Sequence, residues 1–114
     1  MKKFDLEKRT TDFAKAVIET CKALPVNPMN NRIVGQVVGS AGSVGANYRE
    51  ANDALGKKDF LQRMRIARRE AKEAHHWLEL ALTANPNYAV AIKPLINEAE
   101  ELKKIFSAII IKVQ

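Results

Sequence analysis

Apolar side chains recur every three or four residues along most of the chain, and no stretch alternates strictly between apolar and polar residues as a half-buried strand does. Proline or glycine interrupts this pattern at Leu24-Pro25, Gly56 and Asn85-Pro86. Proline disfavours helical geometry in the residue before it, and glycine commonly ends helices. The pattern therefore predicts four helices, over residues of about 8–24, 31–55, 59–84 and 94–113.

Three of these segments carry a continuous apolar face. In the first, the face consists of Phe13, Val17, Cys21 and Leu24. The third and fourth keep long repeats, formed by Phe60, Met64, Ala67, Ala71, Ala74, Leu78 and Ala81 and by Leu95, Ala99, Leu102, Phe106, Ile109 and Val113. Helices with such stripes and short connections pack as antiparallel neighbours. The expected fold is all-α, an antiparallel up-down-up-down four-helix bundle in which residues 1–114 form a single domain.

Side chains at the expected boundaries suit helix ends. Asn30 or Asn31 is a good N-cap for the second helix, and Gly56 is a natural C-cap for it. Asp59 is expected to cap the third helix. Pro94 is expected in the first turn of the fourth helix, with residues 87–92 as a separate short turn before it.

The second segment has an unusual composition for a helix, since four of the chain's five glycines, Gly35, Gly39, Gly42 and Gly45, fall inside it. Each glycine destabilises a helix by roughly 0.5–1 kcal/mol relative to alanine. The preferred interpretation is a helix whose small residues let another backbone approach closely. A partly irregular segment is the alternative.

A line of polar residues follows the same segment at helical spacing: Gln36, Ser40, Ser43, Asn47 and Glu50. Apolar residues flank this line, among them Ile33, Val44 and Leu55, so part of it is expected to be enclosed and hydrogen-bonded to other helices. The third helix offers the expected partners, which are Arg69, Glu70, Glu73 and His76. We call the seven residues Gln36, Ser40, Ser43, Asn47, Glu50, Glu70 and Glu73 the polar stripe.

The chain has 19 Lys and Arg against 13 Asp and Glu, a net charge of +6. Residues 57–72 alone hold seven basic residues against two acidic ones, which is five of the six net charges. Five of these cations lie on or beside one helical stripe and are predicted to bind the phosphates of a nucleic acid: Lys58, Arg65, Arg68, Arg69 and Lys72.

Two alternatives to this prediction stay open. The cations can form a solvated face with pairs such as Arg69 and Glu73, or the binding surface can be a second basic group at the N-terminus, Lys2, Lys3, Lys8 and Arg9. Aromatic residues at helical spacing, such as Phe60 and Trp77, are interpreted as core and not as platforms for bases.

The sequence holds no convincing catalytic or metal-binding constellation. Glu73 and His76 form a Glu-x-x-His motif, but di-iron bundles need this motif on two helices with further carboxylates, for which Glu50 and Glu70 are the candidates. The serines lack an identifiable base, and the lone Cys21 lies on an apolar face. We expect no enzymatic activity, no metal and no cofactor.

The sequence also bears on location. The longest apolar run, Ile109-Ile110-Ile111, is far shorter than the roughly 20 residues that cross a bilayer. Asp5 and Glu7 lie where a secretory signal needs apolar residues, and the single cysteine cannot form an internal disulfide. These features predict a cytoplasmic protein without a membrane partner.

Several runs of the chain form a recognisable set. The most specific are Gln36…Ser43-Val44-Gly45-Ala46-Asn47-Tyr48-Arg49-Glu50-Ala51 and Arg69-Glu70-Ala71-Lys72-Glu73-Ala74…Trp77-Leu78, joined by Phe13-Ala14, Leu24-Pro25, Lys58-Asp59-Phe60 and Ile66-Ala67. In these runs the chain resembles the bacterial 23S rRNA-intervening sequence proteins, also called four helix bundle proteins. The resemblance implies a four-helix bundle that assembles into a homopentamer. It also implies a relation to the basic pentameric accessory proteins of retroelements, which bind nucleic acid and a reverse transcriptase, and it supplies no catalytic residue.

These observations favour a nonenzymatic, oligomeric protein that binds RNA or DNA electrostatically through a basic surface. The alternative is an assembly scaffold whose main partner is another protein, and a metal-dependent enzyme is a distant third. Nothing in the sequence names the nucleic acid or the protein partner.

Overall fold

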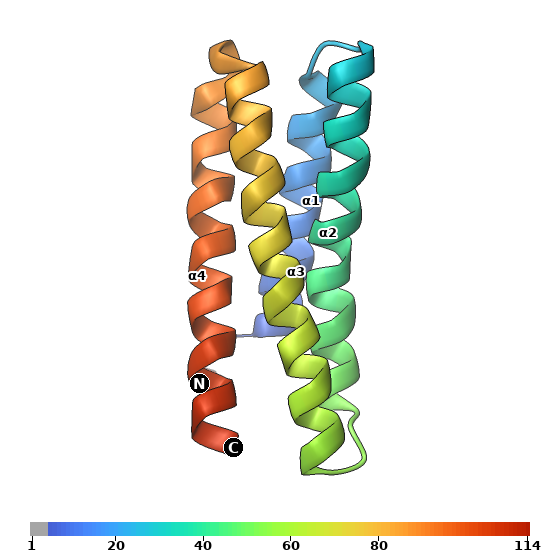
Figure 1. Cartoon of the computed structure of the whole chain (residues 1–114), viewed down its shortest axis with the longest axis vertical. Helices are drawn as coiled ribbons and strands as arrows, with labels where there is room; N and C mark the ends of the chain where they lie inside the picture. The colour runs from blue at the N-terminus through green and yellow to red at the C-terminus, as the bar shows by residue number, and fades with distance from the viewer. Residues whose placement is uncertain (1–4) are drawn as a thin grey trace.

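The computed structural model describes residues 5–114 and contains four α-helices: α1 (Leu6–Ala23), α2 (Pro28–Asn52), α3 (Lys57–Ala84) and α4 (Ala89–Val113). A short 3-10 helix, η1 (Pro86–Tyr88), precedes α4. Successive helices run in opposite directions, and the described residues contain no strand (Figure 1). The predicted all-α antiparallel bundle is confirmed.

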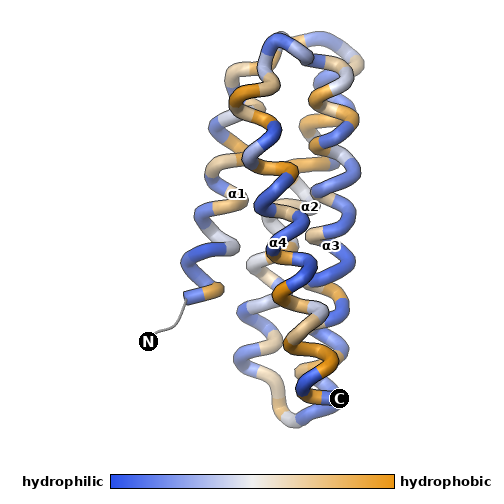
Figure 2. Tube along the Cα trace, turned by 90° about the vertical axis from the view of Figure 1, so that its left-hand side faces the viewer, coloured by the Kyte–Doolittle hydropathy of each residue, from blue (hydrophilic) through white to orange (hydrophobic). Residues whose placement is uncertain are grey.

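The first helix is shorter than the other three, with 18 residues against 25, 28 and 25. It covers only the part of the bundle nearest the α1–α2 and α3–α4 connections, and the opposite end consists of α2, α3 and α4 alone (Figures 1 and 2). Arg9 attaches α1 to α4 through a two-bond ion pair with Glu98, at 2.7 and 2.8 Å. Glu7 attaches α1 to Arg49 of α2 at 3.0 Å.

The core follows the predicted apolar faces closely. In α3, the repeat from Met64 to Ala81 is buried at every predicted position, while Phe60 is half-buried and Leu61 takes a place in the core beside it. In α4, Ile110 is buried and Ile109 only half-buried. Cys21 is also half-buried, packed against the core from the edge of α1.

Helix α2 begins and ends earlier than predicted. Its N-cap is Asn27, whose side chain accepts a hydrogen bond from the Asn30 N–H at 2.8 Å, and Pro28 opens the helix because a first-turn proline lacks only an N–H that has no partner there. At the other end the helix stops at Asn52, so Leu55 lies in the connection, 96% exposed. The predicted continuation to Leu55 is wrong.

The predicted cap roles of Gly56 and Asp59 are also wrong. Gly56 is the N-cap of α3, where its positive φ of 142° suits a residue without a Cβ. Asp59 lies in the first turn of α3, and its carboxylate accepts a hydrogen bond from the backbone N–H of Leu55 at 3.3 Å. Both residues therefore shape the α2–α3 connection, in roles different from those expected.

Helix α4 begins at Ala89, several residues before the predicted start near 94, and Pro94 lies inside it. Proline there removes one helical hydrogen bond and crowds the preceding turn. Ile92 and Leu95 are buried on either side of Pro94, and their packing against the core stabilises the helix through the proline. Tertiary packing therefore outweighs the preference of proline for the first turn of a helix, from which the start near 94 was predicted.

A buried pair of amides joins the α1–α2 and α3–α4 connections. Asn30 and Asn85 exchange two side-chain hydrogen bonds, each 2.9 Å long. Asn30 also donates to the Pro25 carbonyl at 2.8 Å, and Asn85 donates to the Ala81 carbonyl at 2.9 Å. The two turns at this end of the bundle are thereby held to each other.

The glycine-rich stretch of α2 is continuous helix, which confirms the helical interpretation. Only Gly45 is needed for packing within the chain: a Cβ there would come within 2.9 Å of the Thr10 hydroxyl oxygen on α1. Gly35, Gly39 and Gly42 are exposed, and a Cβ on any of them would meet nothing within 4 Å. Among the described residues, no helix is long and apolar enough to cross a membrane.

Candidate nucleic-acid interface

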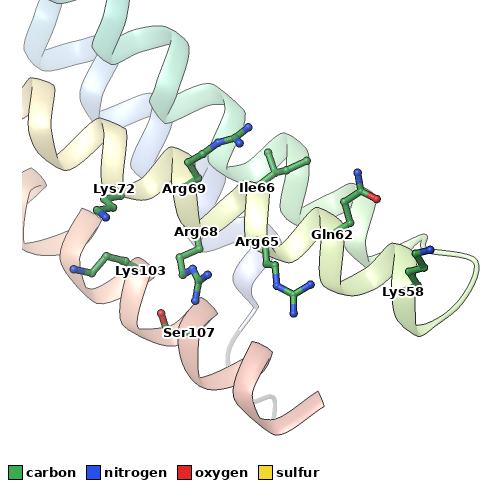
Figure 3. Close-up of a pocket in the computed structure, with 9 residues that line it drawn as sticks. All are labelled: Lys58, Gln62, Arg65, Ile66, Arg68, Arg69, Lys72, Lys103 and Ser107. Atoms are coloured by element: carbon green, nitrogen blue, oxygen red, sulfur yellow. The ribbon is translucent and has the colours of Figure 1, made fainter. Parts of the chain in front are cut away.

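The predicted cations of α3 gather along one groove between α3 and α4 (Figure 3). The groove has a volume of about 1010 Å³. Its lining consists of Lys58, Gln62, Arg65, Ile66, Arg68, Arg69, Lys72, Lys103 and Ser107. All five residues predicted to bind phosphates are therefore brought together, and six of the nine lining residues are cationic while none is acidic. We call this feature the basic groove.

Helical spacing explains how α3 presents these side chains. Lys58, Arg65 and Lys72 are seven residues apart, so they lie on one face at intervals of about 10.5 Å, and the row spans about 21 Å. Figure 3 shows Arg65 and Arg68 extending toward α4, whereas Arg69 extends toward the α2 side. The buried seam of Met64, Ala67 and Ala71 fixes this orientation, because the same helix cannot turn without exposing its core residues.

Helix α4 supplies the opposite wall of the groove through Lys103 and Ser107. Lys103 lies 3.1 Å from Glu100, and its hydrogen bond and positive charge lower the pKa of that carboxyl group. Sequence reasoning missed both wall residues. The only signal in the sequence was the position of Lys103, seven residues after Ile96 at the border of the apolar face of α4. That position does not show which helix packs beside this border.

The charges of the groove are largely uncompensated. Within residues 5–114, none of Lys58, Arg65, Arg68, Arg69 and Lys72 forms an ion pair with a carboxylate, and the only cation of this part of α3 that does is Arg63, 3.9 Å from Asp59. Arg65 donates instead to the side-chain oxygen of Gln114 at 3.1 Å. The predicted alternative pair of Arg69 with Glu73 does not form.

The first two cations of α3 oppose the helix macrodipole. The N-terminal end of a helix carries partial positive charge and favours acidic side chains. Helix α3 instead begins with Lys57 and Lys58 and concentrates its cations in its first half. Lys57 and Lys58 therefore weaken the first turn of α3, where Asp59 offsets part of their effect, and Lys58 adds to the positive potential of the groove.

The polar stripe lies in a second, shallower hollow between α2 and α3. Gln36, Ser40, Ser43, Glu70 and Glu73 line it together with Gly35, Gly39 and Arg69. Asn47 and Glu50 lie beyond it, half-buried and exposed respectively. Three stripe residues of α2 and both stripe residues of α3 thus line the same hollow.

Its expected hydrogen bonds between helices do not form. Ser40 is 7% exposed and donates to the Gln36 carbonyl at 2.9 Å, and Asn47 donates to the Ser43 carbonyl at 2.9 Å. In the described part of the chain, no hydrogen bond links the stripe residues of α2 to α3. The correction has a simple cause, because serine and asparagine in a helix can reach the carbonyl four residues back.

The histidines, the cysteine and the carboxylates do not gather into a metal-binding cluster within the described residues. Over residues 5–114, no three His, Cys, Asp or Glu side chains are close enough together to hold a metal ion. His75 lies 3.7 Å from Glu79 and 3.9 Å from Glu100, between α3 and α4, and the Trp77 ring N–H donates to Glu73 at 3.3 Å. Burial raises the pKa of the Cys21 thiol, which keeps it in its less reactive protonated form.

The fold and the groove define a small antiparallel helical bundle with one strongly basic face. The model of the 23S rRNA-intervening sequence protein family matches residues 2–108, and the chain belongs to this family. It is also similar to a protein of unknown function from Bacteroides thetaiotaomicron, of the S23 ribosomal protein family, whose crystal structure superimposes with a TM-score of 0.82. The two sequences are 30% identical over 93% of this chain and 98% of the other. A comparison with curated proteins found no match.

Proposed function

We propose that this chain is a nonenzymatic nucleic-acid-binding protein that holds RNA or DNA electrostatically in the basic groove. One observation carries the proposal: six cations from two helices line a single groove with no carboxylate among its lining residues. Phosphate contacts require only accessible Lys and Arg, and their energy is largely independent of base sequence.

We further propose that the chain acts as a homo-oligomer. Gly35, Gly39 and Gly42 weaken α2, although the same chain leaves room for a Cβ at each of them, and such a strip of small residues suits the close approach of a second helix. The number of five subunits rests on the family resemblance alone. Five copies would carry five times +6, or about +30, and strengthen the attraction of a polyanion.

The same strip supports the second candidate function, a scaffold whose main partner is another protein. The two candidates differ in their response to salt. Binding through phosphates weakens steeply as salt rises, whereas a scaffold would bind nucleic acid weakly at any salt concentration.

Replacing Arg65, Arg68, Arg69 and Lys72 by Gln tests the proposed function. None of the four makes an ion pair in the described structure or belongs to the buried core, so the fold is expected to survive, as circular dichroism would show. If each residue contacts one phosphate, the slope of log affinity against log salt should flatten by up to about four units per binding subunit.

A matched control removes four cations away from the groove: Lys15, Lys22, Arg32 and Lys93, all exposed. The control has the same net charge as the groove variant and should keep most of the salt slope. An unchanged slope in the folded groove variant would move the binding surface to the N-terminal group. Of that group, Lys8 and Arg9 are already paired with Asp12 and Glu98, and Lys2 and Lys3 lie outside the described residues.

A further inference from the structure

We infer that the basic groove recognises the phosphate backbone of double-stranded nucleic acid in preference to a single strand. This inference rests on the proposed function and adds the strandedness of the ligand. Two features of the groove and one of the ligand carry it: the chemistry of the groove's lining, its straightness and the higher charge density of a duplex.

The lining of the groove offers no aromatic side chain on which bases can stack. Proteins that bind single strands combine cations with aromatic side chains, and each stacked base raises affinity by about five-fold or more. The described lining residues are cationic apart from Gln62, Ile66 and Ser107, and none is aromatic. Phe60 and Trp77, the aromatic residues of α3, are half-buried and lie outside this lining. A single strand therefore gains no aromatic stacking from its exposed bases here.

The groove is also straight and rigid. Lys58 to Lys72 lie on one uninterrupted helix, and Lys103 and Ser107 lie on a second helix packed along it (Figure 3). A duplex is stiff over lengths far beyond the roughly 21 Å of this row, so it meets the groove without losing flexibility. A flexible single strand must be ordered along the row, which costs conformational entropy.

The higher charge density of a duplex also favours duplex binding over single-strand binding. Each phosphate neutralised on B-form DNA contributes about 0.9 to the salt slope, against about 0.7 on a single strand. With four phosphate contacts, and with affinities taken as equal at 1 M salt, the difference corresponds to about six-fold tighter duplex binding at 0.1 M salt. Duplexes are thus predicted to bind more tightly than single strands, and the binding of both is predicted to weaken as salt rises.

Fluorescence anisotropy with the unmodified protein tests the inference. The probes are a mixed-sequence DNA duplex and an RNA duplex of about 20 base pairs, several times the length of the row, and each separated strand, over about 50 to 200 mM salt. We expect both duplexes to bind about six-fold or more tightly than their strands, with steeper salt slopes. Replacing Arg65, Arg68, Arg69 and Lys72 by Gln should abolish the preference, and the control lacking Lys15, Lys22, Arg32 and Lys93 should keep it.

The possible failures are distinguishable. Single strands that bind as tightly as the duplexes would overturn the inference about strandedness and leave the proposed function standing. A duplex preference that survives in the folded groove variant would also overturn the inference, because it would place the duplex elsewhere on the molecule. Absence of salt-dependent binding to every probe would overturn both the inference and the proposed function.

Discussion

At the scale of single residues, substitutions of Asn85 and Asn47 are expected to differ in their cost, because only the loss of Asn85 leaves a buried hydrogen-bonding partner unpaired. Asn85 and Asn30 satisfy each other in a buried site, so Asn85→Ala leaves the Asn30 amide without its partner. We expect a loss of about 1–3 kcal/mol in the free energy of unfolding, measured in urea. A midpoint equal to that of the parent protein would show that water replaces the lost amide without cost.

Asn47→Leu is the matched comparison, and the structure changes its expected outcome. The hydrogen bonds between helices that the sequence pattern predicted for Asn47 would imply a loss of about 1–3 kcal/mol through unpaired partners. Because Asn47 donates only to the Ser43 carbonyl of its own helix, no partner is orphaned, and we expect a change below about 1 kcal/mol. A loss as large as that of Asn85→Ala would indicate a partner outside the single chain.

Gly45 packs against α1 more closely than any other glycine of the chain. A Cβ on Gly45 would lie 2.9 Å from the Thr10 hydroxyl oxygen and 3.3 Å from its Cβ. Thr10 cannot easily move, since it is buried and its hydroxyl donates to the Leu6 carbonyl at 2.8 Å. Gly45→Ala should therefore destabilise the fold by about 1–3 kcal/mol in urea unfolding.

A double-mutant cycle with Thr10→Ala provides the control. The added Thr10→Ala change removes the hydroxyl oxygen, which is the nearest crowding atom, and keeps the Cβ, so it should restore part of the stability that Gly45→Ala loses. Additive losses in the double variant would mean that Gly45 and Thr10 are not in the contact described.

At the scale of elements, both lysines in the first turn of α3 are expected to lower the stability of the fold, and one of them is expected to strengthen nucleic-acid binding. Lys57 and Lys58 both lie at the positive end of the helix dipole, so changing either to Glu should stabilise the fold by about 0.3–1 kcal/mol. Only Lys58 lines the basic groove; Lys57 lines a separate hollow with Phe60 and Val113. Lys58→Glu should therefore weaken nucleic-acid binding clearly more than Lys57→Glu does.

The two variants change the net charge equally, which makes them controls for each other. Binding would be measured by anisotropy at fixed salt and stability by urea unfolding. Equal weakening by both substitutions would mean that binding follows the net charge of the molecule and not the position of its cations in the groove.

At the scale of the whole molecule, the exposed glycines of α2 have open space around them in the single chain. Gly42→Leu has open space around it, so the fold of each subunit should persist. If α2 packs against another copy, the leucine blocks close approach, and light scattering should report a lower mass than for the parent protein.

Ala91→Leu is a suitable control, because Ala91 is exposed on α4 away from α2. This variant should keep the mass of the parent. A parent protein that is a folded monomer at all working concentrations would contradict the proposed oligomer.

The sequence by itself determined the features that depend on spacing within one helix. The repeats of α3 and α4 predicted the buried residues from Met64 to Ala81 and from Leu95 to Phe106, because burial of one helical face follows from a period near 3.6. The same geometry placed Lys58, Arg65 and Lys72 on one line.

Only the tertiary structure decided the features that join two helices. It brought Lys103 and Ser107 of α4 against the cations of α3, separated Gly45 from the three exposed glycines, kept the hydrogen bonds of the polar stripe within α2, and carried α4 through Pro94. The reason is that the register between helices depends on how side chains from both interlock, and the spacing of one helix contains no information about its neighbour.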